Sequence, residues 1–143
     1  MQQVREEDFS RVRSVYDRLK IDAELAPFFA DLPARFAASH LVVSRSGAGT
    51  VAELGAVGRP SILVPLPGSI DQDQFANAGV LAKVEGAIRI PQTEFSSDRL
   101  AAEISAFAAE PARLAAMAEA ARGAGRLDAA EHLADLVVKV AGI

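Results

Sequence analysis

Short apolar runs alternate with longer segments of helical periodicity along the first two thirds of the chain. Continuous apolar runs are typical of parallel strands that are covered on both faces. We expect strands within residues 24–29, 41–44, 61–64 and 87–90. Between them the spacing predicts helices over residues 5–20, 31–37, 50–57 and 72–84. The remainder is predicted to be helical, over residues 97–109, 111–122 and 127–141.

Alternation of strands and helices at this spacing predicts an α/β fold, a Rossmann-like parallel sheet with helices on both faces. We expect one module over residues 1–143, with strand–helix units to about residue 95 and a helical tail over residues 96–143. Two helices carry apolar stripes that we expect to be buried. These stripes are Phe9, Val12, Val15, Tyr16 and Leu19 in the first helix, and Leu133, Leu136, Val137 and Val140 in the last.

A glycine-bearing turn follows the expected strand at 41–44. Gly47 and Gly49 permit a tight turn, and a helix is expected to begin near Thr50. The amides at a helix N-terminus favour a phosphate or another polar group, and the carboxylate of Glu53 is suited to accept from a pair of hydroxyls. An alternative is purely structural, because Thr50-x-x-Glu53 also matches a capping box.

A second polar cluster begins the helix expected after the strand at 61–64. Asp73, Gln74 and Asn77 occur there, and Gln74 and Asn77 share a helix face because they are three residues apart. Amide side chains both donate and accept hydrogen bonds, which suits a neutral polyol such as a sugar. Here too a capping box, Asp71-x-x-Gln74, is the structural alternative.

Both clusters fall on the same predicted edge of the sheet. The loops at residues 27–31, 44–50 and 65–74 each follow an expected strand. Ligands of open parallel sheets bind at the carboxyl ends of the strands. The sequence therefore predicts a binding site where these three loops meet.

Composition narrows the classes of function. The formal net charge is −4, which argues against a general affinity for nucleic acid. With no cysteine and only His40 and His132, the chain has neither disulfides nor a histidine-rich metal site, and we expect no cofactor. No apolar run reaches the roughly 18 to 20 residues that cross a bilayer, so any membrane contact is expected to be peripheral.

Three motifs, in this order, carry a family resemblance. They are Arg45-Ser46-Gly47-Ala48-x-Thr50-x-x-Glu53, then Gly58-Arg59-Pro60 with Val64-Pro65, and then Asp71-Gln72-Asp73-Gln74-x-x-Asn77-Ala78. Together they resemble the C-terminal domain of the MurG family, the peptidoglycan glycosyltransferases of family 28. The resemblance covers nearly the whole chain.

This resemblance implies a GT-B architecture, in which two Rossmann-like domains flank a cleft. The C-terminal domain holds UDP-N-acetylglucosamine (UDP-GlcNAc), and the N-terminal domain meets lipid I and the cytoplasmic face of the bacterial inner membrane. The implied reaction is an inverting transfer of N-acetylglucosamine to the muramyl C4 hydroxyl, which converts lipid I to lipid II for the cell wall.

The resemblance also implies roles for residues of this chain. Glu53 matches the acid that binds the ribose hydroxyls, Gln74 matches the residue that reads the sugar, and the main chain of Phe29 matches a contact to uracil. The implied substrate-binding residues are Phe29, Arg45, Ala48, Gly49, Thr50, Val51, Ala52, Glu53, Asp73, Gln74 and Asn77. No catalytic residue is assigned, because the general base of this family belongs to the other domain.

The sequence departs from the family at its start. The family's domain opens with a strand, a phosphate loop rich in glycine and serine, and a second strand, which we do not find here. We therefore expect a fragment in which residues 24–29 lack neighbouring strands and the strand at 41–44 exposes an edge, so that the chain self-associates. The alternatives are a stand-alone donor-binding subunit of a two-component N-acetylglucosaminyltransferase and a packing domain without a ligand.

Overall fold

The chain divides into two compact units. The computed structural model describes the backbone of residues 1–142 and the side chains of all of these but Ile70. The first unit is Met1–Ala34, and the second begins at Arg35. Each unit is described by itself.

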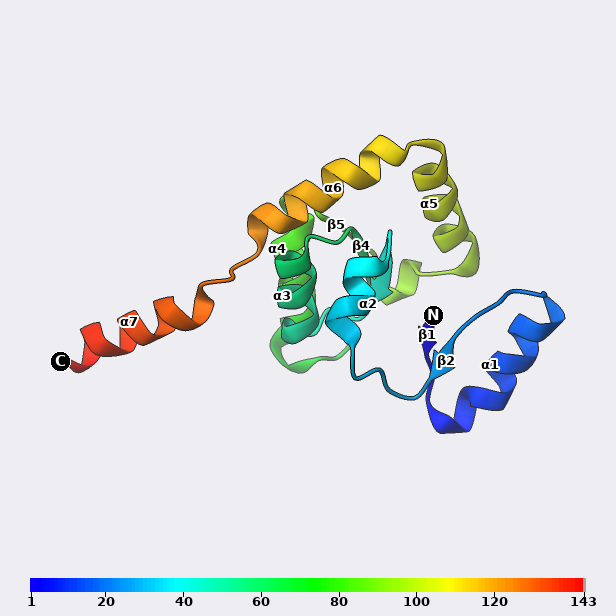
Figure 1. Cartoon of the computed structure of the whole chain (residues 1–143), viewed down its shortest axis with the longest axis horizontal. Coiled ribbons are helices and arrows are strands. Elements are labelled where there is room, and N and C mark those ends of the chain that lie inside the picture. Colours follow the sequence, from blue (N-terminus) through cyan, green and yellow to red (C-terminus); the bar gives the residue numbers. More distant parts are fainter. Residues whose placement is uncertain (143) are drawn as a thin grey trace. The chain divides into compact units, whose positions relative to one another are not determined.

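The first unit consists of two very short parallel strands, which pair with each other, and the one helix that connects them (Figure 1). β1 (Gln2–Gln3) lies beside β2 (Leu25–Ala26), and α1 (Glu6–Arg18) connects them. The ladder continues one residue further, where Val4 N donates to the carbonyl of Ala26 at 2.9 Å. The prediction that residues 24–29 have no neighbouring strand was therefore wrong, because the few residues before α1 are enough to form this ladder.

α1 forms where the periodicity predicts it, but its apolar face is not buried. No residue of α1 is buried, and Val15 and Leu19 are 38% and 57% exposed. The unit offers two short strands as its sheet, which is too little apolar surface to cover a helix of 13 residues. Periodicity predicted the amphipathic helix correctly and its burial wrongly.

The second unit contains a three-stranded parallel sheet. Its order is β3 (Val42–Ser44), β4 (Ser61–Leu63) and β5 (Ala87–Arg89). Ser44 is paired with Leu63, and Leu63 with Arg89, so the carboxyl ends of all three strands lie at one edge. The predicted α/β fold with parallel strands and helices is confirmed.

The remaining helices follow one another along the chain in the expected order (Figure 1). The bounds are α2 (Leu32–Ala38), α3 (Ala48–Val57), α4 (Asp73–Ala82), α5 (Ser97–Ala109), α6 (Pro111–Ala124) and α7 (Ala129–Ala141). Two short 3₁₀ turns, η1 (Ile70–Gln72) and η2 (Gln92–Glu94), precede α4 and α5.

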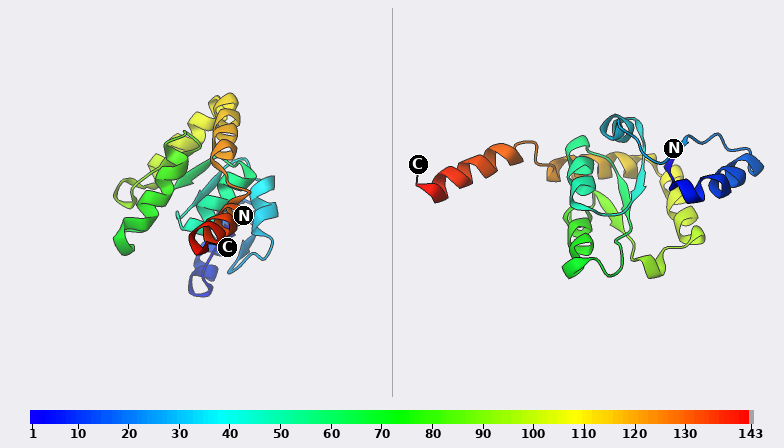
Figure 2. Two further views of the ribbon diagram at one scale, coloured as in Figure 1. Left: turned by 90° about the vertical axis from the view of Figure 1, so that its left-hand side faces the viewer. Right: turned by 90° about the horizontal axis from the view of Figure 1, so that it is seen from below.

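The sheet is covered on both faces (Figure 2). On one face Ile62 and Val64 pack with Ile90, with Phe107 of α5 and with Met117 of α6. Leu63 lies between Ile62 and Val64 in β4, so its side chain points to the other face, on the side of α3 and α4. Burial on both faces explains why these strands read as continuous apolar runs.

α7 leaves its apolar stripe uncovered. No residue of α7 is buried, and Leu133 and Val140 are 62% and 80% exposed. The prediction that this stripe faces inward was wrong, because no described element packs over it. Taken over residues 1–142, the helices are too short or too polar for any of them to cross a membrane.

α3 and α6 approach each other through glycine. A Cβ added to Gly125 would lie 2.5 Å from the carbonyl oxygen of Gly55, and one added to Gly86 would lie 2.7 Å from the backbone of Ala121 in α6. Contacts this short leave no room for a methyl group, and they involve backbone that is already packed. The glycines therefore set the distance between α6 and the rest of the second unit.

We expect Gly125→Ala to lower the free energy of unfolding by about 1–3 kcal/mol, the usual effect of overpacking a closed contact. Gly123→Ala is the matched control, since a Cβ at Gly123 meets nothing within 4 Å. This control is expected to be neutral or to stabilise α6 by up to about 1 kcal/mol. Urea unfolding of the 143-residue chain, followed by circular dichroism, measures both; equal effects of the two variants would contradict the packing argument.

Candidate functional site

The turn after β3 leads directly into α3. Gly47 is the N-cap residue and no side chain caps the helix, whose first hydrogen bond runs from Val51 N to the carbonyl of Gly47 at 3.0 Å. The amides of Ala48, Gly49 and Thr50 therefore have no partner in the described chain. The capping-box alternative for Thr50 and Glu53 was wrong, because the helix begins two residues before Thr50.

Side chains of this first turn differ in what they offer a ligand. Val51 is buried at 6% exposure, so only its main chain is available, and Ala52 is exposed. Glu53 is exposed and has no hydrogen-bond or ion-pair partner among the described residues. Its carboxylate is free to accept from a ligand.

α4 begins in an unusual way. Asp71 and Gln72, which precede it, both have positive φ, at 50° and 56°. Gln72 is the N-cap residue, again without a side-chain hydrogen bond, and the carboxylate of Asp73 accepts from the next amide, Gln74 N, at 2.7 Å. The second capping-box alternative was also wrong, because the Gln74 side chain bonds to another loop and not to Asp71.

That other loop orients the amide of Gln74. The Oε1 atom of Gln74 accepts a hydrogen bond from the backbone N–H of Leu66 at 3.0 Å. The Nε2 group remains as a donor, so Gln74 presents N–H groups to a ligand's oxygens. Gln74 and Asn77, one turn further along α4, are both half-buried.

Two side chains between β3 and α3 tie the loops together. Ser46 Oγ donates to the carbonyl of Gln74 at 2.8 Å. Arg45 Nη1 donates to the carbonyls of Val64 and Pro65, both at 3.2 Å, just beyond β4. The start of α3, the end of β4 and the start of α4 therefore meet at the carboxyl edge of the sheet.

The sequence prediction omitted some residues of this edge. Ser46 belongs to the glycine motif but is not among the predicted site residues, and Arg89 is predicted only as part of a strand. A single arginine at the end of an apolar strand is the signal that indicates a position at the sheet edge. Ser44 Oγ is buried without a hydrogen-bond partner in the described chain and also lies at this edge.

The remaining predicted residue is Phe29, which is buried. It belongs to the first unit, so its part in the site stays a prediction. In the described part of the chain, no three histidine, aspartate or glutamate side chains gather where they would hold a metal ion.

The edge combines three chemical functions. Two helix N-termini without side-chain caps, those of α3 and α4, favour negative charge beside them. Glu53 is an acceptor for hydroxyls and Gln74 a donor to oxygen. An elongated ligand with an anionic centre and hydroxyls on both sides fits such a set of groups.

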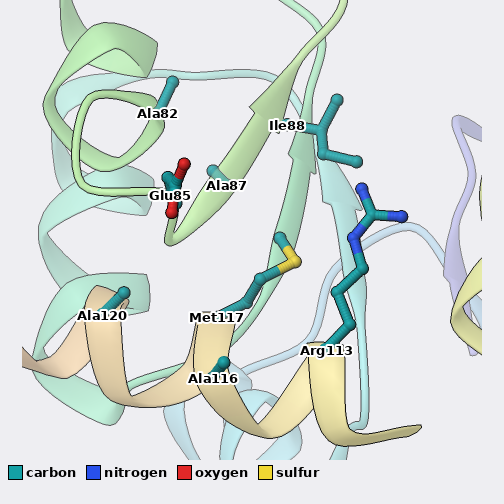
Figure 3. Close-up of a pocket in the computed structure, with 8 residues that line it drawn as sticks. All are labelled: Ala82, Glu85, Ala87, Ile88, Arg113, Ala116, Met117 and Ala120. Carbon is teal, nitrogen blue, oxygen red and sulfur yellow. The ribbon is translucent and has the colours of Figure 1, made fainter. Parts of the chain in front are cut away.

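A hollow of about 360 Å³ lies elsewhere in the second unit (Figure 3). It is beside the first residues of β5, at the amino edge of the sheet, with Met117 and Arg113 reaching towards it from α6 (Figure 3). Its lining is Ala82, Glu85, Ala87, Ile88, Arg113, Ala116, Met117 and Ala120. This lining is mostly alanine and apolar, and it shares no residue with the predicted site.

Comparison with known proteins gives consistent matches. The glycosyltransferase family 28 C-terminal domain matches residues 1–133. An N-acetylglucosamine transferase of Bradyrhizobium diazoefficiens, named for transfer from UDP-N-acetylglucosamine to N-acetylmuramyl-(pentapeptide) pyrophosphoryl-undecaprenol, is 85% identical over 99% of this chain and 39% of its own length. A transferase of the same name from Nitrobacter hamburgensis is 79% identical over 98% of this chain and 38% of its own.

The solved structures give a match at lower identity. The crystal structure of Acinetobacter baumannii MurG superposes with a TM-score of 0.85 over 96% of this chain and 42% of that one, at 27% identity. The present chain thus spans about two fifths of the length of these relatives.

Proposed function

The chain belongs to the glycosyltransferase family 28 C-terminal domain family, and from this premise we propose that it is the donor-binding part of a peptidoglycan glycosyltransferase. The protein that contains it transfers N-acetylglucosamine from UDP-GlcNAc to lipid I and so forms lipid II. One observation supports the proposal above all: the Ser46–Gln74 hydrogen bond brings together the two helix starts that were predicted to bind the donor.

Each part of the donor has a candidate partner. The amides of Ala48, Gly49 and Thr50 face the diphosphate, with Arg45 beside them. Glu53 accepts from the ribose hydroxyls, and the residues from Val51 to Glu53 complete that wall. Gln74 and Asn77 donate to the sugar hydroxyls, the Asp73 carboxylate accepts from them, and the main chain of Phe29 is the proposed contact to the uracil.

In the proposed transfer reaction, this chain stabilises the leaving group, UDP. The lipid I hydroxyl attacks the anomeric carbon, the bond to UDP breaks, and negative charge grows on the diphosphate. Fixed amides at a helix N-terminus stabilise that charge without reorganising, which is commonly a large electrostatic contribution to catalysis. We assign the general base to a part of the protein outside this chain and propose no catalytic residue, metal or cofactor within it.

We place the whole protein peripherally on the cytoplasmic face of the bacterial inner membrane, where lipid I is the acceptor. Lipid I contacts lie outside this chain. Nucleic acid is not a proposed partner, in keeping with the net charge of −4.

Glu53→Ala in the full-length protein is expected to weaken UDP-GlcNAc binding by about 1–3 kcal/mol, since a charge-assisted pair of hydrogen bonds is lost. Because Glu53 has no partner in the described chain, the free energy of unfolding should stay within about 0.5 kcal/mol of its original value. Calorimetric titration and urea unfolding measure the two effects. Glu119→Ala, an exposed glutamate on α6, is the matched control, and unchanged donor affinity in Glu53→Ala would contradict the ribose role.

Gln74→Ala is expected to reduce the preference for UDP-GlcNAc over UDP-N-acetylgalactosamine, in which the C4 hydroxyl has the opposite configuration, and to affect the affinity for UDP much less. The physical reason is that its Nε2 donors are assigned to the sugar and not to the nucleotide. Competition titrations with the three ligands give the ratio directly. Gln92→Ala, in the exposed turn η2, serves as the control, and equal losses for UDP and UDP-GlcNAc would exclude a sugar-reading role.

We further propose that the 143-residue chain self-associates when it is produced alone. β3 pairs only with β4 among the described strands, and Val43 and the stripe of α7 are exposed. Unpaired strand edges and apolar faces favour association with a second chain. Sedimentation velocity should show a mass that rises with concentration, whereas a monomer at every concentration would contradict this.

A further inference from the structure

The first turn of α4 is held from two sides. Ser46, just after β3, donates to the carbonyl of Gln74, and Arg89, the last residue of β5, donates to the carbonyl of Phe75 at 3.1 Å. These are consecutive carbonyls of one helical turn. β3 and β5 flank β4 in the sheet, so the two contacts reach α4 from opposite neighbours of the strand that precedes it.

Ser46 is fully buried, with 0% of its surface exposed. A buried hydroxyl that lost its partner would be costly, so the 2.8 Å bond to the Gln74 carbonyl fixes both groups. A carbonyl oxygen has two lone pairs, and this one can accept from Ser46 while it also takes part in the helix. The bond thus positions α4 without breaking it.

The guanidinium of Arg89 packs closely against α4. Its guanidinium carbon lies 3.7 Å from the centre of the Phe75 ring, a cation–π contact. Gly79, one turn along α4, leaves room for the same guanidinium, because a Cβ there would lie 3.3 Å from Arg89 Nη1. The cation–π contact with Phe75, the hydrogen bond to its carbonyl and the absence of a side chain at Gly79 together fix Arg89 on the first two turns of α4.

The helix needs external support at this end. Asp71 and Gln72 both adopt left-handed backbone conformations, which cost energy for residues other than glycine. No side chain caps α4, and the residues from Leu66 to Gly68 that lead towards it are exposed. Among the described residues, the preceding loop contributes only the bonds from Leu66 N to Gln74 Oε1 and from Gln72 N to the Ser69 carbonyl, so we infer that contacts from the sheet are also needed to fix where α4 begins.

We propose that Ser46 and Arg89 are positioning residues that fix the first turn of α4, and thereby the amide of Gln74, for recognition of the donor sugar. The inference rests on the proposed function and deepens it. Neither residue touches the sugar; each acts through a main-chain carbonyl on the turn that carries the sugar-reading side chain.

The experiment uses the full-length protein and five single variants, with Gln74→Ala as a background for a double variant. Ser46→Ala and Arg89→Met remove the two contacts, and Arg89→Lys retains a cation and a donor. Ser61→Ala and Arg113→Met are matched controls: Ser61 is equally buried but its hydroxyl has no partner in the described chain, and Arg113 stacks on Phe107 and makes no hydrogen bond or ion pair there with the first turn of α4. We would measure the affinities for UDP-GlcNAc, UDP-N-acetylgalactosamine and UDP, and separately the amide hydrogen exchange at residues 73–78.

Ser46→Ala and Arg89→Met should each lower the preference for UDP-GlcNAc over UDP-N-acetylgalactosamine about three- to tenfold, the range of effect that one hydrogen bond commonly has. The affinity for UDP should change less than twofold, and exchange at residues 73–78 should accelerate. Arg89→Lys should recover part of the preference, and the two controls should change neither readout. In a Gln74→Ala background, Ser46→Ala should lower the preference less than twofold further.

Unchanged sugar preference in Ser46→Ala and Arg89→Met overturns the inference, even if exchange accelerates. Equal losses of affinity for UDP and UDP-GlcNAc would also overturn it, because they would indicate general damage to the site. The inference is overturned as well if Ser46→Ala lowers the sugar preference in the Gln74→Ala background as much as it does alone. If the unsubstituted protein shows no preference for UDP-GlcNAc, the proposed function fails and this inference fails with it. The unsubstituted protein therefore separates the two failures.

Discussion

The hydrogen bond between the Ser46 hydroxyl and the Gln74 carbonyl determines how the two halves of the candidate site meet. Parallel pairing of β3, β4 and β5 brings the carboxyl ends of the strands to one edge, but it leaves the direction of each following segment open. The buried serine removes that freedom between the segments that follow β3 and β4. Arg45 adds a second connection from the same turn to the carbonyls at the end of β4.

The absence of side-chain caps on α3 and α4 is consistent with a binding role. Elsewhere the chain does cap a helix: Ser96 Oγ accepts from Arg99 N at the start of α5. A capping serine or aspartate typically stabilises a helix by about 1 kcal/mol. α3 forgoes this contribution, and the amides of Ala48, Gly49 and Thr50 remain available to a ligand, whereas at α4 the Asp73 carboxylate accepts from Gln74 N. Stability is thus lower at the start of α3, where the proposed site requires open donors.

Local signals in the sequence predicted the fold well, and the structure brings the starts of α3 and α4 to one edge of the sheet. Apolar runs marked β3, β4 and β5 to within one residue at each end, because burial on both faces leaves a continuous pattern. Helix starts were less accurate, since Thr50-x-x-Glu53 matches a capping box even though Gly47 begins α3 earlier. The faces of α1 and α7 were wrong for another reason: periodicity identifies an apolar stripe but does not say what covers it.

Long-range contacts account for what the sequence did not reveal. Ser46 and Arg89 donate to main-chain carbonyls 28 and 14 residues away. Because every residue has such a carbonyl, the residue types in the sequence do not reveal which ones accept these bonds. Because the acceptors are main-chain carbonyls, these two hydrogen bonds do not depend on which side chains α4 carries. The Asn77 side chain makes no hydrogen bond within the described chain, so we expect its substitution to leave α4 in position, whereas Asp73 accepts from Gln74 N and contributes to the start of the helix. A change at Ser46 or Arg89 is expected to move the main chain of that turn, and with it every side chain that the turn carries.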